Sequence, residues 1–213
     1  RRSINNMKNL PNKIGLALII LVNVIGAIGF RSEILLPLFK LLTPFNLLLT
    51  LAICLFNLPF KKFIFPFIYV FTIGFGLEIV GVETKLLFGD YDYNGSVLGT
   101  QLFNVPLIIG VNWFILTIGT RACANWLTKS ILLQIVFAAI LMVGLDLLIE
   151  PIAIKYEFWN WAQNEVPKQN YLMWLIASIF MQAIITKKSS LIPYSLGFTI
   201  VASQLIFFVS LLL

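Results

Sequence analysis

The run ILLQIVFAAILMVGLDLLIE, residues 131–150, decides the fold of this chain. At a rise of about 1.5 Å per residue, a helix of this length crosses the hydrocarbon core of a bilayer, which is about 30 Å thick. The only charged residues of the run, Asp146 and Glu150, stand near its end. The run is therefore predicted to be a transmembrane helix that carries two carboxyl groups close to one membrane surface.

Six further apolar runs have a comparable length. Hydrophobic residues make up 60% of the 213 residues and charged residues 11%, which lies far outside the range of soluble domains. We therefore expect an all-α, polytopic transmembrane helix bundle of about seven helices, forming a single domain over residues 1–213. The predicted spans are residues 14–30, 42–60, 63–80, 105–121, 131–150, 171–186 and 191–213.

The start of the second helix is left open by the sequence. Residues 33–40 are either its first turns or a short helix at the membrane interface. Pro37 and Pro44 mark possible breaks, because proline removes a backbone donor from a helix.

The charges divide between the two ends of these helices. With a cytoplasmic N-terminus, the inner segments hold ten basic residues and no acidic one, whereas all nine acidic residues fall toward the outer side. The positive-inside rule then predicts a cytoplasmic N-terminus and an outer C-terminus. It also explains the net charge of +6 without nucleic acid as a partner. The inner basic residues are Arg1, Arg2, Lys8, Lys13, Lys61, Lys62, Arg121, Lys129, Lys187 and Lys188.

Histidine is absent from the chain. This excludes Ser-His-Asp and Cys-His nucleophile systems and histidine-ligated metal sites. The sequence also lacks a GxGxxG fingerprint, a Walker loop and a DDxxD motif for metal diphosphates. We expect neither a metal nor a cofactor.

Four carboxyl groups are predicted to meet near the outer surface. Counted from the inner ends of their helices, Glu78 lies about 24 Å deep and Asp146 about 23 Å, so the two share a level. Glu83 and Glu150 lie roughly one turn further out, where solvation by headgroups is an equal alternative. A carboxyl group within hydrocarbon costs several kcal/mol and usually faces a cavity or a partner, which favours a functional site for Glu78 and Asp146.

Further polar and aromatic residues flank this level. Asn112 and Trp113 lie in the fourth helix, Tyr91 and Tyr93 follow the third, and Asn170 opens the sixth. A buried amide such as that of Asn112 needs hydrogen-bond partners. The outer loop after the fifth helix contains FWNW at residues 158–161, whose tryptophans are predicted to belong to the aromatic belt of the membrane surface.

Several blocks of residues 74–174, taken together, carry a family resemblance. They are GLEIVGVETKLLFGDYDYNGSVLG, NVPLIIGVNWF, MVGLDLLIEPIAIKYEFWNW and VPKQNYLMW. The segment resembles the carotenoid biosynthesis membrane proteins, which include the carotenoid 1,2-hydratases and bisanhydrobacterioruberin hydratase. This chain has Lys85 where many members have glycine, and Glu150 where many have aspartate.

The resemblance implies an enzyme that adds water to the terminal C1=C2 double bond of an acyclic carotenoid, lycopene-like or C50. Protonation of such an alkene needs an acid held away from bulk water, and the resulting tertiary cation needs anionic or aromatic stabilisation. We expect Asp146 or Glu78 to donate the proton and the other to stay ionised, while Glu83 or Glu150 orients the water. The substrate- and water-binding residues expected around them are Asn112, Trp113, Tyr91, Tyr93 and Asn170.

Two alternatives stay open at this point. A membrane lycopene cyclase shares the protonation step, but an internal double bond captures its cation. A carotenoid-binding or ion-handling membrane protein would use the acids without catalysis. We expect a protein of a bacterial inner membrane that contacts lipid. Other carotenoid-pathway enzymes are expected partners of a carotenoid-modifying enzyme, because its substrate is insoluble.

Overall fold

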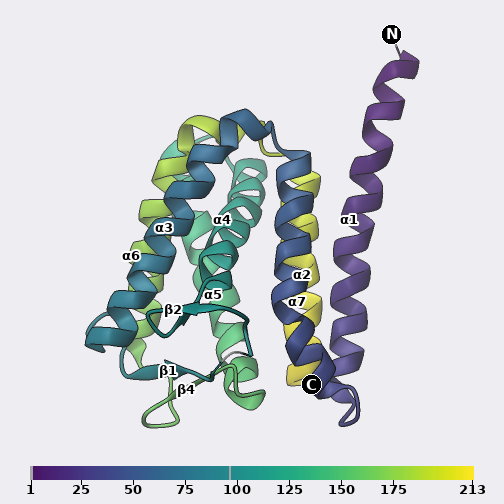
Figure 1. Ribbon diagram of the computed structural model, residues 1–213. Helices are drawn as coiled ribbons and strands as arrows, with labels where there is room; N and C mark the ends of the chain where they lie inside the picture. Colours follow the sequence, from purple (N-terminus) through teal and green to yellow (C-terminus); the bar gives the residue numbers. More distant parts are fainter. Residues whose placement is uncertain (1, 96) are drawn as a thin grey trace.

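The computed structural model describes residues 2–95 and 97–213, with side chains from residue 13 onward. Seven helices make up most of this part of the chain, and consecutive helices run antiparallel. Figure 1 shows them side by side as one bundle, with α1 at its edge. The helices are α1 (Arg2–Arg31), α2 (Leu36–Asn57), α3 (Phe60–Thr84), α4 (Ile108–Leu127), α5 (Ile131–Lys155), α6 (Lys168–Ile185) and α7 (Tyr194–Leu212), with a 3-10 turn, η1 (Thr186–Leu191), between the last two. The predicted helix bundle is confirmed.

Six of the seven helices are long and apolar enough to cross a membrane, and α4 is the exception. It is the central helix and packs against α2, α3, α5, α6 and α7. Because these neighbours cover almost its whole length, α4 can carry polar side chains such as Thr117, Thr120 and Arg121, all without solvent exposure. Helices around the rim face lipid and are more uniformly apolar.

Short strands form a cap at one end of the bundle, which the sequence did not predict. β1 (Tyr91–Tyr93) pairs with β4 (Trp159–Trp161), and β2 (Gln101–Leu102) pairs with β3 (Val105–Pro106), both antiparallel. Figure 1 shows the cap at the end where α3 and α5 terminate. The predicted start of the fourth helix at residue 105 was therefore wrong, since residues 105–106 belong to the β2–β3 hairpin and α4 begins at Ile108.

The second helix begins at Leu36 and continues without a break. Pro37 occupies its first turn, where the missing backbone donor has no helical partner to lose. Pro44 lies inside the helix and is buried. Of the two possibilities, residues 36–40 are thus the first turns of α2 and not a separate interfacial helix.

The alternation of the helices separates the charges as expected. Lys61 and Lys62 begin α3 and Lys187 and Lys188 lie in η1, at the end of the bundle opposite the strands (Figure 1). Arg1 lies outside the described residues, as do the side chains of Arg2 and Lys8. Which end faces the cytoplasm stays a prediction.

The structure corrects the predicted position of Arg121. We placed it in an inner connecting segment, but α4 continues to Leu127 and the Arg121 side chain is fully buried. Its guanidinium donates to the Asn125 side chain, the Gln182 carbonyl and the hydroxyls of Thr186 and Ser189. It therefore ties α4 to the end of α6 and to η1.

Candidate active site

Three of the four predicted carboxyl groups meet in one buried pocket beneath the strand cap. Glu78 comes from α3, and Asp146 and Glu150 come from α5; none exceeds 5% exposure. The two helices each pack against both α4 and α6, which brings their acidic residues together between them. Glu78 lies six residues before the end of α3, about 9 Å along the helix, so the pocket sits just inside the capped end.

Glu78 accepts three hydrogen bonds. Tyr91 and Tyr93 donate their hydroxyls to Oε2 at 2.6 and 2.9 Å, and the Trp113 indole donates to Oε1 at 3.1 Å. Burial, together with the charge of Glu78, raises the pKa of both phenols, so they act as neutral donors. Both oxygens of Glu78 therefore have donors, an arrangement that stabilises an ionised carboxylate.

The close approach of α3 to α4 places Trp113 against Glu78. A Cβ atom added at Gly74 would lie 2.6 Å from Trp113 Cγ, so glycine is required for the indole to pack there. On its other side, the Trp113 ring stacks on Trp174 of α6, with ring centroids 4.0 Å apart. The Trp113 ring is thus fixed from both sides while its N–H points to the carboxyl group.

Glu150 is held by β4, the strand that pairs with β1. The indoles of Trp159 and Trp161 donate to its Oε2 at 3.0 and 2.8 Å. We predicted these tryptophans to be part of the aromatic belt at the membrane surface. That prediction was wrong for their indole N–H groups, which belong to the site.

Strand geometry explains why four aromatic donors reach the carboxyl groups together. Side chains alternate between the two faces of a strand, and the pairing aligns Tyr91 with Trp161 and Tyr93 with Trp159. The four aromatic rings therefore share one face of the ladder, toward Glu78 and Glu150. The residues between them, Asp92 and Asn160, are exposed on the other face.

Asp146 has the fewest donors of the three carboxyl groups. Asn170, at the start of α6, donates its side-chain amide to Asp146 Oδ2 at 2.8 Å and lies 3.5 Å from Glu150 Oε1. Asp146 Oδ1 is buried and has no hydrogen-bond partner among the described residues. This oxygen is thus the unsatisfied polar atom of the pocket.

Asn112 completes the pocket wall, and no lysine or arginine is among the described residues that line it. In the part of the chain that the structure describes, no group of three or more acidic, cysteine or histidine side chains is arranged to hold a metal ion. The further lining residues are Phe88, Ile109, Ile149 and Trp174.

Glu83 does not join the other acids. Its side chain is exposed and lies 3.4 Å from the Asn104 amide, outside the pocket. The predicted convergence of four carboxyl groups therefore holds for three. Glu83 is still within α3, but five residues at about 100° each turn it about 140° around the helix from Glu78, so it points away from the pocket.

Neither nearby lysine neutralises the carboxyl groups. Lys85 pairs with Asp90 at 2.5 Å on the surface. Lys155 donates to the Leu211 carbonyl and lies over the Tyr156 ring. The backbone at Lys85 is left-handed, with φ of 60°, and caps the end of α3. That conformation favours glycine and accounts for the glycine expected there from the resemblance.

Fold and site together define a polytopic membrane protein with a buried, aromatic-lined carboxyl pocket at one end of its helix bundle. The chain belongs to the carotenoid biosynthesis protein family, whose model matches residues 38–212. It is thus an integral membrane protein.

A curated relative is similar over much of the chain. It is the bisanhydrobacterioruberin hydratase of Haloarcula japonica, 27% identical over 154 residues, which cover 66% of this chain and 50% of the relative. The chain therefore spans about half the length of the relative it matches. No solved structure matches it.

Proposed function

We propose that this chain is a carotenoid-modifying enzyme, and specifically a hydratase that adds water to the terminal double bond of an acyclic carotenoid. Family membership and the hydratase relative support the substrate class. The observation that carries the reaction is the unequal hydrogen bonding of three buried carboxyl groups in one pocket. Because the carboxyl groups receive different numbers of hydrogen bonds, we assign the proton donor and the anion to different residues.

Asp146 is the proton donor in this proposal. A protonated carboxyl group needs fewer donors than an ionised one, and Asp146 has one, from Asn170, whereas Glu78 has three. The Oδ1 atom without a partner is free to carry the proton and to present it to a substrate. General acid catalysis by a positioned carboxyl group typically contributes about 10²–10⁴-fold in rate.

The electron pair of the alkene takes the proton of Asp146 at the less substituted carbon, which leaves a tertiary cation at the other carbon. Glu78, held ionised by Tyr91, Tyr93 and Trp113, stabilises that cation through space. The aromatic rings that line the pocket add cation–π stabilisation.

Water then attacks the cation and forms the carbon–oxygen bond of a tertiary alcohol. Glu150 accepts the proton that the water loses, and Asn112 and Asn170 help to orient the water molecule. Asp146 and Glu150 stand at i and i+4 on α5 and both approach the Asn170 amide, so transfer of a proton between them restores the starting state. The cycle consumes only alkene and water and uses no cofactor.

The products formed in living cells test the proposal. The chain should be expressed in a lycopene-accumulating bacterium and the carotenoids analysed by mass spectrometry. A hydratase adds the mass of one water per reacted end. An isomer of unchanged mass would indicate a cyclase instead, and unchanged lycopene bound to the purified protein would indicate a carotenoid-binding protein.

A further inference from the structure

A second, larger space lies beside the carboxyl pocket. It is a cavity of about 460 Å³ between α1, α2, α5 and α7, within the size range of small-molecule sites. Its walls are mainly aliphatic and aromatic. Residues of α4 line the cavity as well, and because α2 and α7 each pack against α1 and α4, these helices and α5 surround a common space.

The cavity adjoins the carboxyl pocket. Ile109, Asn112, Ile149 and Trp159 line both spaces. A linear molecule in the cavity can therefore place one end between these four residues and meet Glu78, Asp146 and Glu150. The remainder of the molecule would lie against hydrocarbon side chains.

The lining also reaches the outer surface of the bundle. Ile25 of α1 and Leu42 and Phe45 of α2 line the cavity and are 46%, 41% and 60% exposed. These positions are apolar and lie six to nine residues inside the ends of membrane-spanning helices, about 9 Å or more along the helix, where the surroundings are lipid. The cavity is thus open to the bilayer on the side of α1 and α2.

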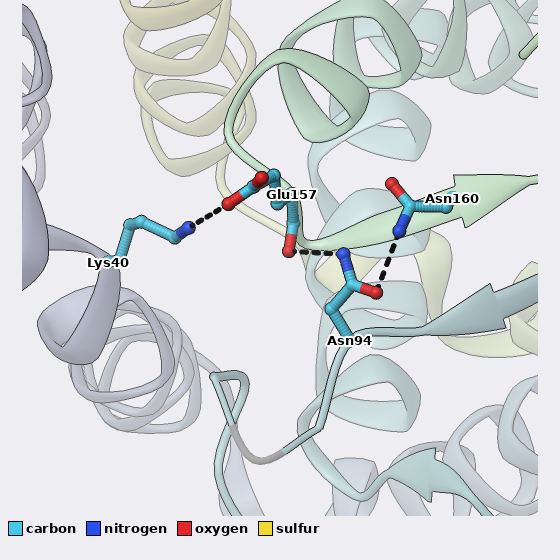
Figure 2. Close-up of polar contacts among 4 residues, drawn as sticks. All are labelled: Lys40, Asn94, Glu157 and Asn160. Carbon is cyan, nitrogen blue, oxygen red and sulfur yellow. Dashed lines mark hydrogen bonds and ion pairs between the residues drawn. The ribbon is translucent and has the colours of Figure 1, made fainter.

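A polar network joins α2 to the strand cap near one end of the cavity (Figure 2). Lys40 near the start of α2 pairs with Glu157 at 3.4 Å, and Asn94 donates to the Glu157 carbonyl and accepts from Asn160. The network joins α2 to the strand cap beside Phe158, which lines the cavity.

Two buried acceptors in the cavity wall have no hydrogen-bond donor among the described residues, Asn46 Oδ1 and Gln204 Oε1. Gln204 is 9% exposed. Each of these acceptors has lost the hydrogen bond that water would give it. A hydrocarbon supplies no donor for these two oxygens, so recognition of a polyene rests on the apolar remainder of the lining.

We infer that this cavity binds the polyene chain of the substrate, which enters sideways from the bilayer past α1 and α2 and places its end group at the carboxyl pocket. That this polyene belongs to a carotenoid rests on the proposed function. The apolar lining, the shared wall with the carboxyl pocket and the opening toward lipid all suit a long linear hydrocarbon.

Binding of a non-reactive polyene tests this inference. The full chain is reconstituted in lipid nanodiscs and titrated with a linear conjugated tetraene fatty acid, which lacks the trisubstituted terminal alkene and cannot be hydrated. Energy transfer from tryptophan to the tetraene reports binding. Thr43→Phe and Asn46→Phe fill the cavity from α2, and Leu41→Phe and Leu48→Phe are matched controls at exposed α2 positions that do not line it.

We expect saturable binding to the unchanged protein and to both controls, and at least tenfold weaker binding to a correctly inserted cavity-filling variant. Two filling variants guard against a failure of one to fold. Equal binding to filled and control variants would overturn the inference. Because the tetraene is never hydrated, a protein that binds it in this pattern but forms no hydrated carotenoid would contradict the proposed reaction and leave the binding cavity standing.

Discussion

Two acidic residues in the same pocket differ in what surrounds them. Glu78 receives three donors from three aromatic side chains, whereas Asp146 receives one amide and keeps one oxygen without a partner. Hydrogen-bond donors favour the charged form of a carboxyl group, and this is why we propose Glu78 as the anion and Asp146 as the proton donor. The sequence predicted both residues as candidates and could not order them, since their depths are alike.

The charge of Glu78 should matter to the rate more than to assembly. Glu78→Gln keeps the shape of the side chain but removes the anion that stabilises the cation. We expect hydration to fall about 10²–10³-fold, as when a preorganised electrostatic group is lost. Product formation by membranes with matched protein content measures it; unchanged hydration would contradict the role of Glu78.

Lys85 is expected to have no part in the chemistry. Lys85→Gly should keep hydration at its original level and leave thermal stability unchanged or raised by up to about 1 kcal/mol, because glycine adopts the left-handed conformation without strain. Thermal unfolding in detergent and a hydration assay check this together. A loss of product with an intact fold would show that the lysine acts on the site.

At the scale of elements, the strand ladder brings together groups that are far apart in the sequence. Neither YDY nor WNW is long enough to predict a strand by itself. Their shared alternation of aromatic and polar residues is the signal that could have paired them, because it places all four rings on one face. The prediction of an aromatic belt for Trp159 and Trp161 treated each tryptophan alone and missed this pairing.

The pairing of β1 with β4 can be weakened by a substitution in β4. Trp161→Phe keeps an aromatic ring against Tyr91 but removes one of the two donors to Glu150. We expect a loss of about 1–3 kcal/mol in the free energy of unfolding and a several-fold slower hydration. Trp126→Phe is the matched control, since Trp126 is 60% exposed and lies away from the pocket. Equal behaviour of the two variants would contradict the role given to the ladder.

Apolar periodicity predicted the helices well because length and hydropathy suffice for lipid-facing spans. It failed at α4, where the helix is surrounded by protein and tolerates polar residues over its last two turns, so that its end was placed at Arg121 instead of Leu127. Glu83 failed for a related reason. Its depth was estimated from its distance along the helix, but the five-residue spacing also turns it about 140° away from Glu78, and that rotation was left out.

The contacts of Arg121 make it a structural connection between α4 and α6. Arg121→Gln would remove the donor to the hydroxyls of Thr186 and Ser189. It would also remove one of the two donors to the Gln182 carbonyl, which accepts from the Thr186 hydroxyl as well. We expect a loss of about 2–4 kcal/mol in stability, with the carboxyl pocket at the other end still able to react in the folded fraction. Lys129→Gln, at an exposed position, is the control in a thermal unfolding measurement. A variant as stable as that control would contradict this role.

The whole molecule places Lys61, Lys62, Lys187 and Lys188 at the end of the bundle opposite the carboxyl pocket. The positive-inside rule then predicts that the strand cap and the carboxyl pocket face away from the cytoplasm. A reporter enzyme that is active only outside the cytoplasm, fused after Leu213, should be active, and a fluorescent reporter that folds only inside should stay dark. The reverse pattern would invert the orientation and leave the site unchanged.

The central claim is that Asp146 protonates a carotenoid end group, and one comparison of variants tests it most directly. Asp146→Asn and Glu83→Gln each remove one carboxyl group near the same end of the bundle, but only Asp146 lies in the pocket. In lycopene-accumulating cells with equal amounts of inserted protein, we predict hydrated carotenoid from Glu83→Gln at the original level and a loss of about 10²-fold or more from Asp146→Asn. Hydrated product from Asp146→Asn at the level of the unchanged protein would contradict the account.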